Sequence, residues 1–179
     1  MTDEGYVPLV IREFKRLKTL ADGAMDQLSD DGLFAVPKEG DNSAAVIIKH
    51  VSGNMRSRWQ DFLTSDGEKP DRDRDAEFVI TAEDSRQPLL HRWDEAWGIM
   101  FASLESLNPQ DLQRKVVIRG EHLTVLQAIN RQLTHYAYHV GQIVYVAKHL
   151  RGHDWKSLSI PLGGSQKFNQ SPAKYINHP

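Results

Sequence analysis

The chain has 179 residues, of which 40% are hydrophobic and 26% are charged, and its formal net charge is −2 at pH 7. This profile fits one globular domain over residues 1–179, and it disfavours nucleic acid and anionic membranes, which attract strongly basic surfaces. The sequence contains no cysteine, which excludes disulfides, thiolate metal ligands and a cysteine nucleophile.

Two amphipathic helices are predicted in the first third of the chain. Apolar residues recur every three or four positions over residues 6–28 and again over 44–63, which is the period of a helix with one buried face. Asn42 or Ser43 is suited to cap the second helix. The stretch 64–76 (TSDGEKPDRDRDA) is charged and has no apolar period, so we predict a solvated loop there.

A third helix and a short β-hairpin are predicted next. Thr81 and Asp84 have the spacing of a capping box, in which each side chain satisfies a backbone N–H of the other, and we expect the helix to start there. Asn108–Pro109 should end it, because proline cannot continue a helix interior. Residues 115–123 are rich in β-formers around an Arg-Gly turn, which is typical of a small hairpin that leans on the helices.

The fourth predicted helix opens on a second capping box, Thr124 and Gln127, and continues to Leu150. Residues 151–179 contain the prolines Pro161 and Pro172, a Gly-Gly pair and a final Pro179, so we expect an irregular tail that is partly packed on the helices. The pattern predicts an all-α fold, an antiparallel four-helix bundle over residues 6–150 with a hairpin before its last helix.

The start of the chain and its hydropathy bear on location. The first residues, MTDEGYVPLV, are acidic where a secretory signal would be basic, and no apolar run reaches the roughly 18 residues that span a bilayer. We therefore expect a cytoplasmic protein.

Three histidines are the candidate metal ligands. His135 and His139 are four residues apart, so they lie one turn apart on one face of the fourth helix. His50 lies on the core-facing side of the second helix, and it completes the set if the two helices are neighbours. Three imidazoles suit a divalent transition metal and leave a coordination position for water or substrate. A buried histidine with a hydrogen bond is the alternative for each residue alone, but burying three unpaired imidazoles together is costly.

Several other side chains near these histidines have two interpretations. Asn54, Arg58 and Gln142 lie within two turns of a candidate ligand, where they could orient the ligands or bind an anionic substrate. For Arg58 and Gln142 the alternative is an exposed or merely structural polar group. Four aromatic residues either line a pocket or, more commonly for helical spacing, belong to the core: Trp93, Trp97, Tyr136 and Tyr138. The remaining histidines are expected on the surface or at helix ends: His91, His122, His149, His153 and His178. No catalytic acid or base is identifiable.

The segments 47–55 (IIKHVSGNM) and 135–143 (HYAYHVGQI), with the predicted hairpin between them, resemble the DinB/YfiT-like superfamily of four-helix bundle metalloproteins. The resemblance covers residues 6–150, and the tail from Trp155 is similar to one branch of that superfamily. It implies that His50, His135 and His139 bind one metal ion, zinc or nickel before iron or manganese. It also implies a homodimer.

The superfamily includes bacillithiol S-transferases, a mycothiol-dependent maleylpyruvate isomerase and the metal-binding domain of ergothioneine-pathway sulfoxide synthases. The isomerase has a glutamate where this chain has His135, so the chain looks closer to the three-histidine S-transferases. The resemblance implies that the metal activates a small-molecule thiol for transfer to an electrophile. A metal-dependent hydrolase and a non-catalytic metal-binding protein remain alternatives.

Overall fold

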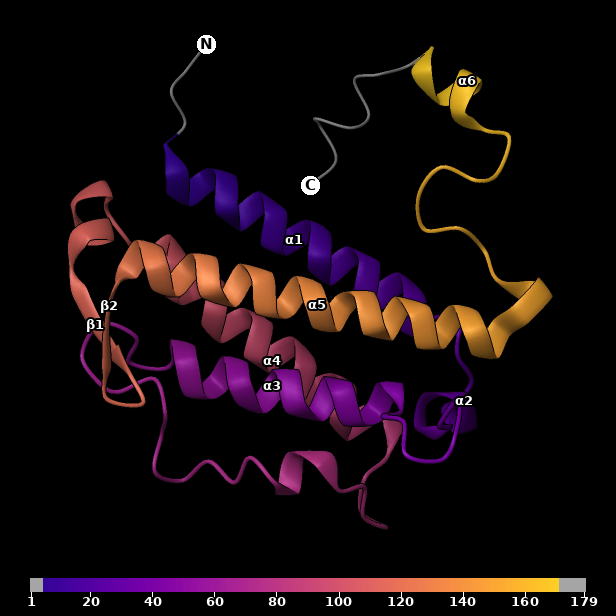
Figure 1. Cartoon of the computed structure of the whole chain (residues 1–179), viewed down its shortest axis with the longest axis horizontal. Helices are drawn as coiled ribbons and strands as arrows, with labels where there is room; N and C mark the ends of the chain where they lie inside the picture. The colour runs from indigo at the N-terminus through magenta and orange to yellow at the C-terminus, as the bar shows by residue number, and fades with distance from the viewer. Residues whose placement is uncertain (1–4, 171–179) are drawn as a thin grey trace.

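The computed structural model describes residues 5–170, and this part of the chain is mostly helical, with a small antiparallel hairpin before the last long helix (Figure 1). The four long helices are α1 (Tyr6–Met25), α3 (Ala44–Trp59), α4 (Arg86–Glu105) and α5 (Val125–Arg151). The short elements are α2 (Asp30–Phe34), η1 (Ala76–Phe78), η2 (Pro109–Gln113), β1 (Lys115–Ile118), β2 (Glu121–Thr124), η3 (Gly152–Asp154) and α6 (Ser165–Asn169).

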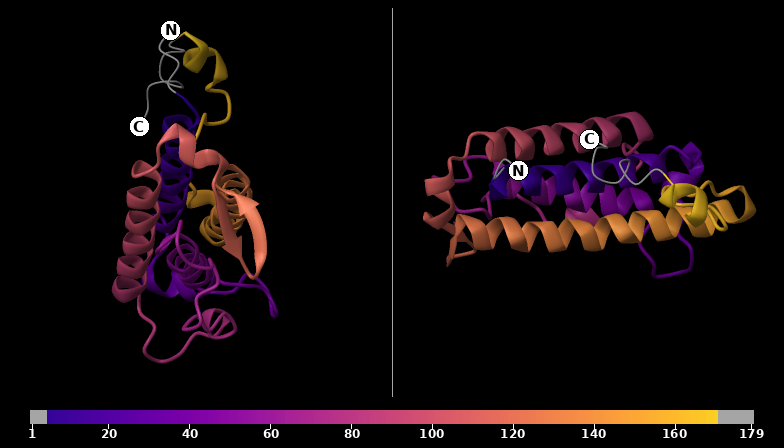
Figure 2. Two further views of the ribbon diagram at one scale, coloured as in Figure 1. Left: turned by 90° about the vertical axis from the view of Figure 1, so that its left-hand side faces the viewer. Right: turned by 90° about the horizontal axis from the view of Figure 1, so that it is seen from above.

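The four long helices run side by side, with the hairpin at one end (Figure 2). Helix α3 packs on both α4 and α5, and α1 also packs on both, so the four share one core. Phe14 lies at its centre, where its ring contacts Trp59, Trp97 and Tyr136 at centroid distances of 6.3, 6.4 and 6.0 Å. Trp93, Trp97 and Tyr136 are buried there, so the core interpretation of these aromatic residues is the right one, whereas Tyr138 is exposed.

Two of the predicted helix starts are confirmed. The Ser43 hydroxyl accepts a hydrogen bond from the backbone N–H of Val46, and Thr124 and Gln127 form a reciprocal capping box at the start of α5. These caps satisfy backbone donors that have no partner inside the helix. Capping residues next to a strong apolar period were therefore sufficient to locate α3 and α5.

Other predicted helix limits were wrong. Helix α1 ends at Met25 and α3 at Trp59, three and four residues before the predicted ends at 28 and 63. After α3 the chain turns sharply at Asp61, which has a positive φ of 51°. The third long helix begins at Arg86, because Asp84 is held by Thr81 and by the Lys49 ammonium group in a separate turn.

The hairpin has the predicted position and turn. Strands β1 and β2 pair in a register that places Lys115 opposite Thr124 and Ile118 opposite Glu121. Arg119 and Gly120 both have positive φ, 56° and 75°, as a two-residue hairpin turn requires.

The segment 64–76 is not a solvated loop throughout. The backbone N–H of Gly67 donates to the Val117 carbonyl of β1, and the side chain of Arg72 is only 5% exposed. Charged residues pair with one another in this segment, which allows them to pack against α3 and the hairpin. The sequence pattern identified the charges but not their partners.

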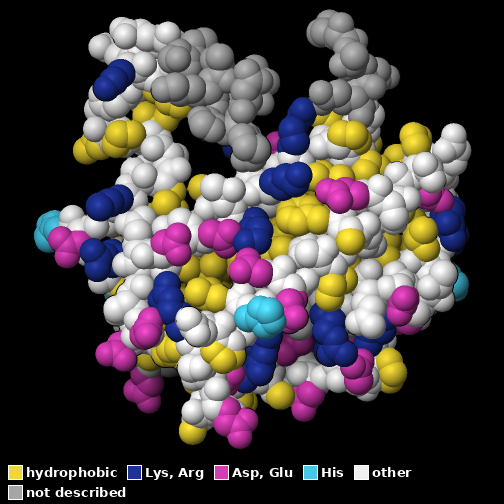
Figure 3. All heavy atoms as spheres, turned by 180° about the vertical axis from the view of Figure 1, so that it is seen from behind, with side chains coloured by type: hydrophobic (Ala, Val, Ile, Leu, Met, Phe, Trp, Pro, Cys, Tyr) yellow, Lys and Arg dark blue, Asp and Glu magenta, His cyan; other side chains and the backbone are white. Residues whose placement is uncertain are grey.

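The tail is less irregular than predicted, because it contains the short helix α6. Trp155 and Leu158 pack against the core, and residues 171–179 of the predicted tail lie outside the described part. Within residues 5–170, no helix combines the length and apolarity needed to cross a membrane. Lys and Arg side chains are interspersed with Asp and Glu on the face seen in Figure 3, consistent with the balanced charge of the sequence.

Candidate metal centre

The structure brings His50, His135 and His139 together between α3 and α5. His50 is 5% exposed, and the two histidines of α5 are half-buried. One ring nitrogen from each residue lies within 4.8 Å of the other two. The Nε2 atoms of His135 and His139 are 3.0 Å apart, which confirms that their four-residue spacing makes the rings converge.

These three imidazoles fit a metal ion. Zinc–nitrogen bonds of about 2.0–2.1 Å at tetrahedral angles place ligand nitrogens about 3.4 Å apart. The observed nitrogens span separations from 3.0 Å to within 4.8 Å, so side-chain shifts of about 1 Å would bring them to that distance. A purely nitrogen donor set suits zinc, nickel, iron(II) or copper. The group could therefore hold one transition metal.

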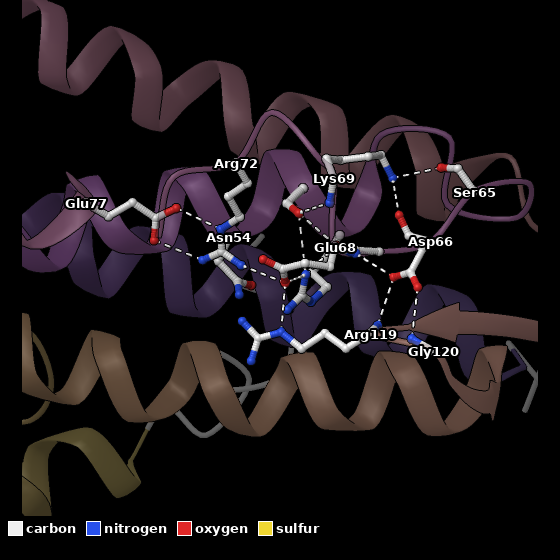
Figure 4. A network of polar contacts seen from close by, with 12 residues as sticks. Asn54, Ser65, Asp66, Glu68, Lys69, Arg72, Glu77, Arg119 and Gly120 are labelled. Carbon is white, nitrogen blue, oxygen red and sulfur yellow. Dashed lines mark hydrogen bonds and ion pairs between the residues drawn. The ribbon is translucent and has the colours of Figure 1, made fainter. Parts of the chain in front are cut away.

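His50 is oriented by a carboxylate from η1. Its Nδ1 lies 2.8 Å from Oε2 of Glu77, so Nδ1–H donates to the carboxylate and the lone pair of Nε2 is left for a metal. Arg72 holds the other side of Glu77 through two hydrogen bonds of 2.8 and 2.9 Å (Figure 4). Burial opposes ionisation of Glu77, but the hydrogen bonds from His50 and Arg72 outweigh it and lower the pKa of this carboxyl group.

Gly53 makes room for this carboxylate. It lies on α3 three residues after His50, and a Cβ atom at this position would overlap Oε1 and Cδ of Glu77. Gly53 has an ordinary helical conformation, so the requirement for glycine here comes from the close approach of Glu77 and not from its backbone angles.

His139 has its own outer partner. Its Nδ1 lies 2.8 Å from Oε1 of Gln142, and the Gln142 amide donates to the hydroxyl oxygen of Tyr138 at 3.1 Å. Gln142 therefore orients one of the three candidate ligands. It keeps the proton of His139 on Nδ1 and turns Nε2 toward the shared centre.

Within residues 5–170, no hydrogen bond joins Asn54 or Arg58 to the three histidines. Asn54 accepts a hydrogen bond from the Tyr136 hydroxyl in the core. The guanidinium group of Arg58 is buried and pairs with Glu68 at 2.9 Å. Neither residue therefore orients one of the three histidines through a hydrogen bond.

The segment that carries Glu77 is anchored to the hairpin at its other end (Figure 4). Oε2 of Glu68 accepts hydrogen bonds from Arg58, Arg72 and Arg119. The carboxylate of Asp66 accepts the backbone N–H groups of Arg119 and Gly120 in the hairpin turn. Residues 66–77 therefore connect the hairpin turn to His50 through an unbroken set of charged hydrogen bonds.

Sequence reasoning missed Glu77 and Arg72, because neither lies in an apolar period or at a metal-ligand spacing. The glycine shortly after His50 was the one local sign that something approaches α3 closely. Four of the other histidines, His91, His122, His149 and His153, are exposed as expected, and His178 lies outside the described residues.

Burial gives the metal-free centre a pH dependence. Desolvation, with the nearby positive charges of His139 and His50, lowers the pKa of His135 to about 3, whereas an unfolded histidine titrates at about 6.5. Between these values the unfolded state binds more protons, so the free energy of unfolding should fall as pH falls below 6.5.

Urea midpoints at pH 7 and pH 5, measured with a chelator present, check this expectation. His135→Gln should lose less stability over this interval than the wild type, while His122→Gln, at an exposed position, should match the wild type. Equal losses in all three proteins would contradict it. The lowered pKa of Glu77 makes the free energy of unfolding depend on pH only below about pH 4.5, outside this interval.

The fold and this centre define a mostly helical protein with a group of three histidines that could hold a metal ion. The chain belongs to the family described as Protein of unknown function (DUF1572), whose model matches residues 2–164. No curated protein and no solved structure matches the chain.

Proposed function

We propose that this protein is a DinB/YfiT-like four-helix bundle that uses one divalent transition metal to transfer a low-molecular-weight thiol to an electrophile. His50, His135 and His139 are the proposed ligands, zinc or nickel the first candidates, and iron or manganese the next. The observation that carries the proposal is the convergence of three imidazole nitrogens within 4.8 Å.

Two further features support the proposal. One histidine comes from α3 and a pair from α5, with the hairpin immediately before α5, which is the order that the resemblance implies. His135 also stands where the isomerase relatives have a glutamate, in agreement with a three-histidine S-transferase. The homodimer is part of the proposal on the strength of the resemblance alone.

When bound, such a metal lowers the pKa of a coordinated thiol, so that the nucleophilic thiolate exists at neutral pH. Glu77 and Gln142 keep protons on the Nδ1 atoms of His50 and His139, which leaves both Nε2 atoms unprotonated. The chain has no cysteine, so the sulfur is supplied by the cosubstrate.

In the proposed transfer the sulfur attacks the electrophilic carbon and a carbon–sulfur bond forms. The leaving group departs with the electron pair of its former bond to carbon, and the thiol proton passes to solvent. The roles of the chain are to hold the three nitrogens in place and to fix their protonation.

The test compares metal-loaded and metal-free protein, purified without an affinity tag, with monochlorobimane and a panel of low-molecular-weight thiols. We expect conjugation at a rate that requires both the metal and one preferred thiol. A rate no higher than that of metal-free protein would count against S-transfer. Hydrolysis of amides or thiol adducts without added thiol would indicate a hydrolase, and tight metal retention without any turnover would indicate a binding protein.

A further inference from the structure

A cavity of about 470 Å³ lies beside Gln142, the hydrogen-bond partner of His139. Its walls come from α5, from the connector between α2 and α3, and from the start of α3, including Ile47. Cavities of about 300–1,000 Å³ are the size that proteins use for small organic molecules. We call it the tyrosine pocket, after Tyr138 and Tyr145.

The two tyrosines give the pocket an aromatic lining. Tyr138 is 63% exposed and Tyr145 is 69% exposed, although large aromatic rings are usually buried. They are seven residues apart on one face of α5, about 10.5 Å along the helix axis. Gly141 lies between them, and a Cβ atom added there would meet nothing within 4 Å. The two rings therefore lie on either side of an open space, which we call the slot, and Gly141 lies at its base.

The polar groups of the pocket disfavour an anionic ligand. Among the described residues that line it, Asp41 alone carries a charge, so an anionic group would be repelled. The Tyr138 oxygen accepts a hydrogen bond from Gln142, and within residues 5–170 its own O–H proton has no acceptor. A ligand with an aromatic face and a neutral acceptor would match this lining.

The tyrosine pocket lies next to the outer partner of His139. Gln142 lines the pocket and also binds Nδ1 of His139, and the ring of Tyr138 lies 4.9 Å from that of His139. A second cavity, of about 650 Å³ between α3 and α4, meets the centre only through Glu77 and carries charges of both signs. The tyrosine pocket carries a single charged residue where the second cavity carries several, so it suits an apolar aromatic group better.

We infer that the tyrosine pocket binds an aromatic group of an organic substrate, one that carries no negative charge. That this substrate is the electrophile of the thiol transfer rests on the proposed function, whereas the binding itself does not depend on it. The aromatic group lies against the tyrosine rings over Gly141, and Asp41 disfavours ligands with a carboxylate.

Binding is tested on metal-free protein, so that a carboxylate probe cannot bind a metal. The probes are 4-fluorobenzyl alcohol, which is neutral, and 4-fluorobenzoate, which is anionic, each followed by fluorine NMR titration. We expect the wild type to bind the alcohol at least threefold more tightly than the benzoate. Gly141→Leu fills the slot and should weaken binding of the alcohol at least tenfold.

Gly98→Leu is the matched control, because Gly98 is an exposed helical glycine on α4 with no atom within 4 Å of an added Cβ. Both substitutions favour the helix, so lost binding in one of them is not unfolding. Asp41→Asn should reduce the preference for the neutral probe. Absence of alcohol binding by the wild type, unchanged binding in Gly141→Leu, or an equal loss in Gly98→Leu would overturn the inference.

The same variants separate this inference from the proposed function. Conjugation of 1-chloro-2,4-dinitrobenzene should fall at least tenfold in kcat/KM in Gly141→Leu, while iodoacetamide, which has no ring, should react at the wild-type rate. Probe binding without any thiol transfer would support the inference about the pocket and contradict the proposed function. If thiol transfer occurs and Gly141→Leu changes the rate with neither electrophile, the inference about the pocket is contradicted and the proposed function is not.

Discussion

Replacing His135 with alanine should reduce metal affinity about a thousandfold and leave the purified protein with little bound metal. The binding free energy of a structural zinc ion is about 10–16 kcal/mol, so one ligand of three contributes about 4 kcal/mol of it. Each 1.4 kcal/mol changes the affinity tenfold. His135 is the best choice for substitution, because it is half-buried and its Nε2 lies 3.0 Å from Nε2 of His139.

The measurement is elemental analysis of tag-free protein, followed by competition with a chelating dye to obtain affinities. His122→Ala is the matched control, since His122 is an exposed histidine on β2. Circular dichroism establishes that both variants are folded. Sub-stoichiometric metal in the wild type, or full occupancy in His135→Ala, would remove the metal centre and the function proposed from it.

Gly53→Ala should weaken metal binding about 10- to 100-fold, although it touches no ligand. The added methyl group would occupy the position of the Glu77 carboxylate, which must then leave His50 and Arg72. Loss of an outer partner of a metal-ligating histidine typically has this magnitude. Alanine also favours a helix over glycine by about 0.5–1 kcal/mol, so the helix itself should not suffer.

Glu77→Gln should give a comparable loss, because a neutral amide stabilises the His50 tautomer less than a carboxylate does. The double variant should be little worse than either single one, since both substitutions act through the same contact. Gly98→Ala, on an exposed face of α4, controls for the change of residue type. Additive losses, or unchanged affinity in Gly53→Ala, would show that Glu77 does not orient His50.

Local sequence patterns sufficed to predict most of the helices, and they identified the three histidines that the structure brings together. The apolar periods located four long helices, and the spacing of His135 and His139 by one helical turn is a local property that survives in the structure. His50 required the further assumption that its helix lies next to α5, and the two helices are indeed in contact.

The parts that could not be predicted depend on contacts between distant residues. Glu77 meets His50 across 27 positions, and Asp84 is drawn away from the start of α4 by Lys49 across 35. Charged residues without apolar periodicity are predicted to be solvated, because the sequence does not reveal which opposite charge will pair with each of them. Arg72 is the clearest case, a loop arginine whose side chain is almost wholly buried.

The close approach of Glu77 to Gly53 has an evolutionary consequence. Any β-carbon at position 53 excludes the carboxylate from the place where it meets His50, so the glycine has a function only while the acid is present. Within the family the two positions should be inherited as a pair, and a lineage that loses the acid is free to lose the glycine. Members that keep the three histidines but have a larger residue at position 53 must support the first histidine from another part of the chain.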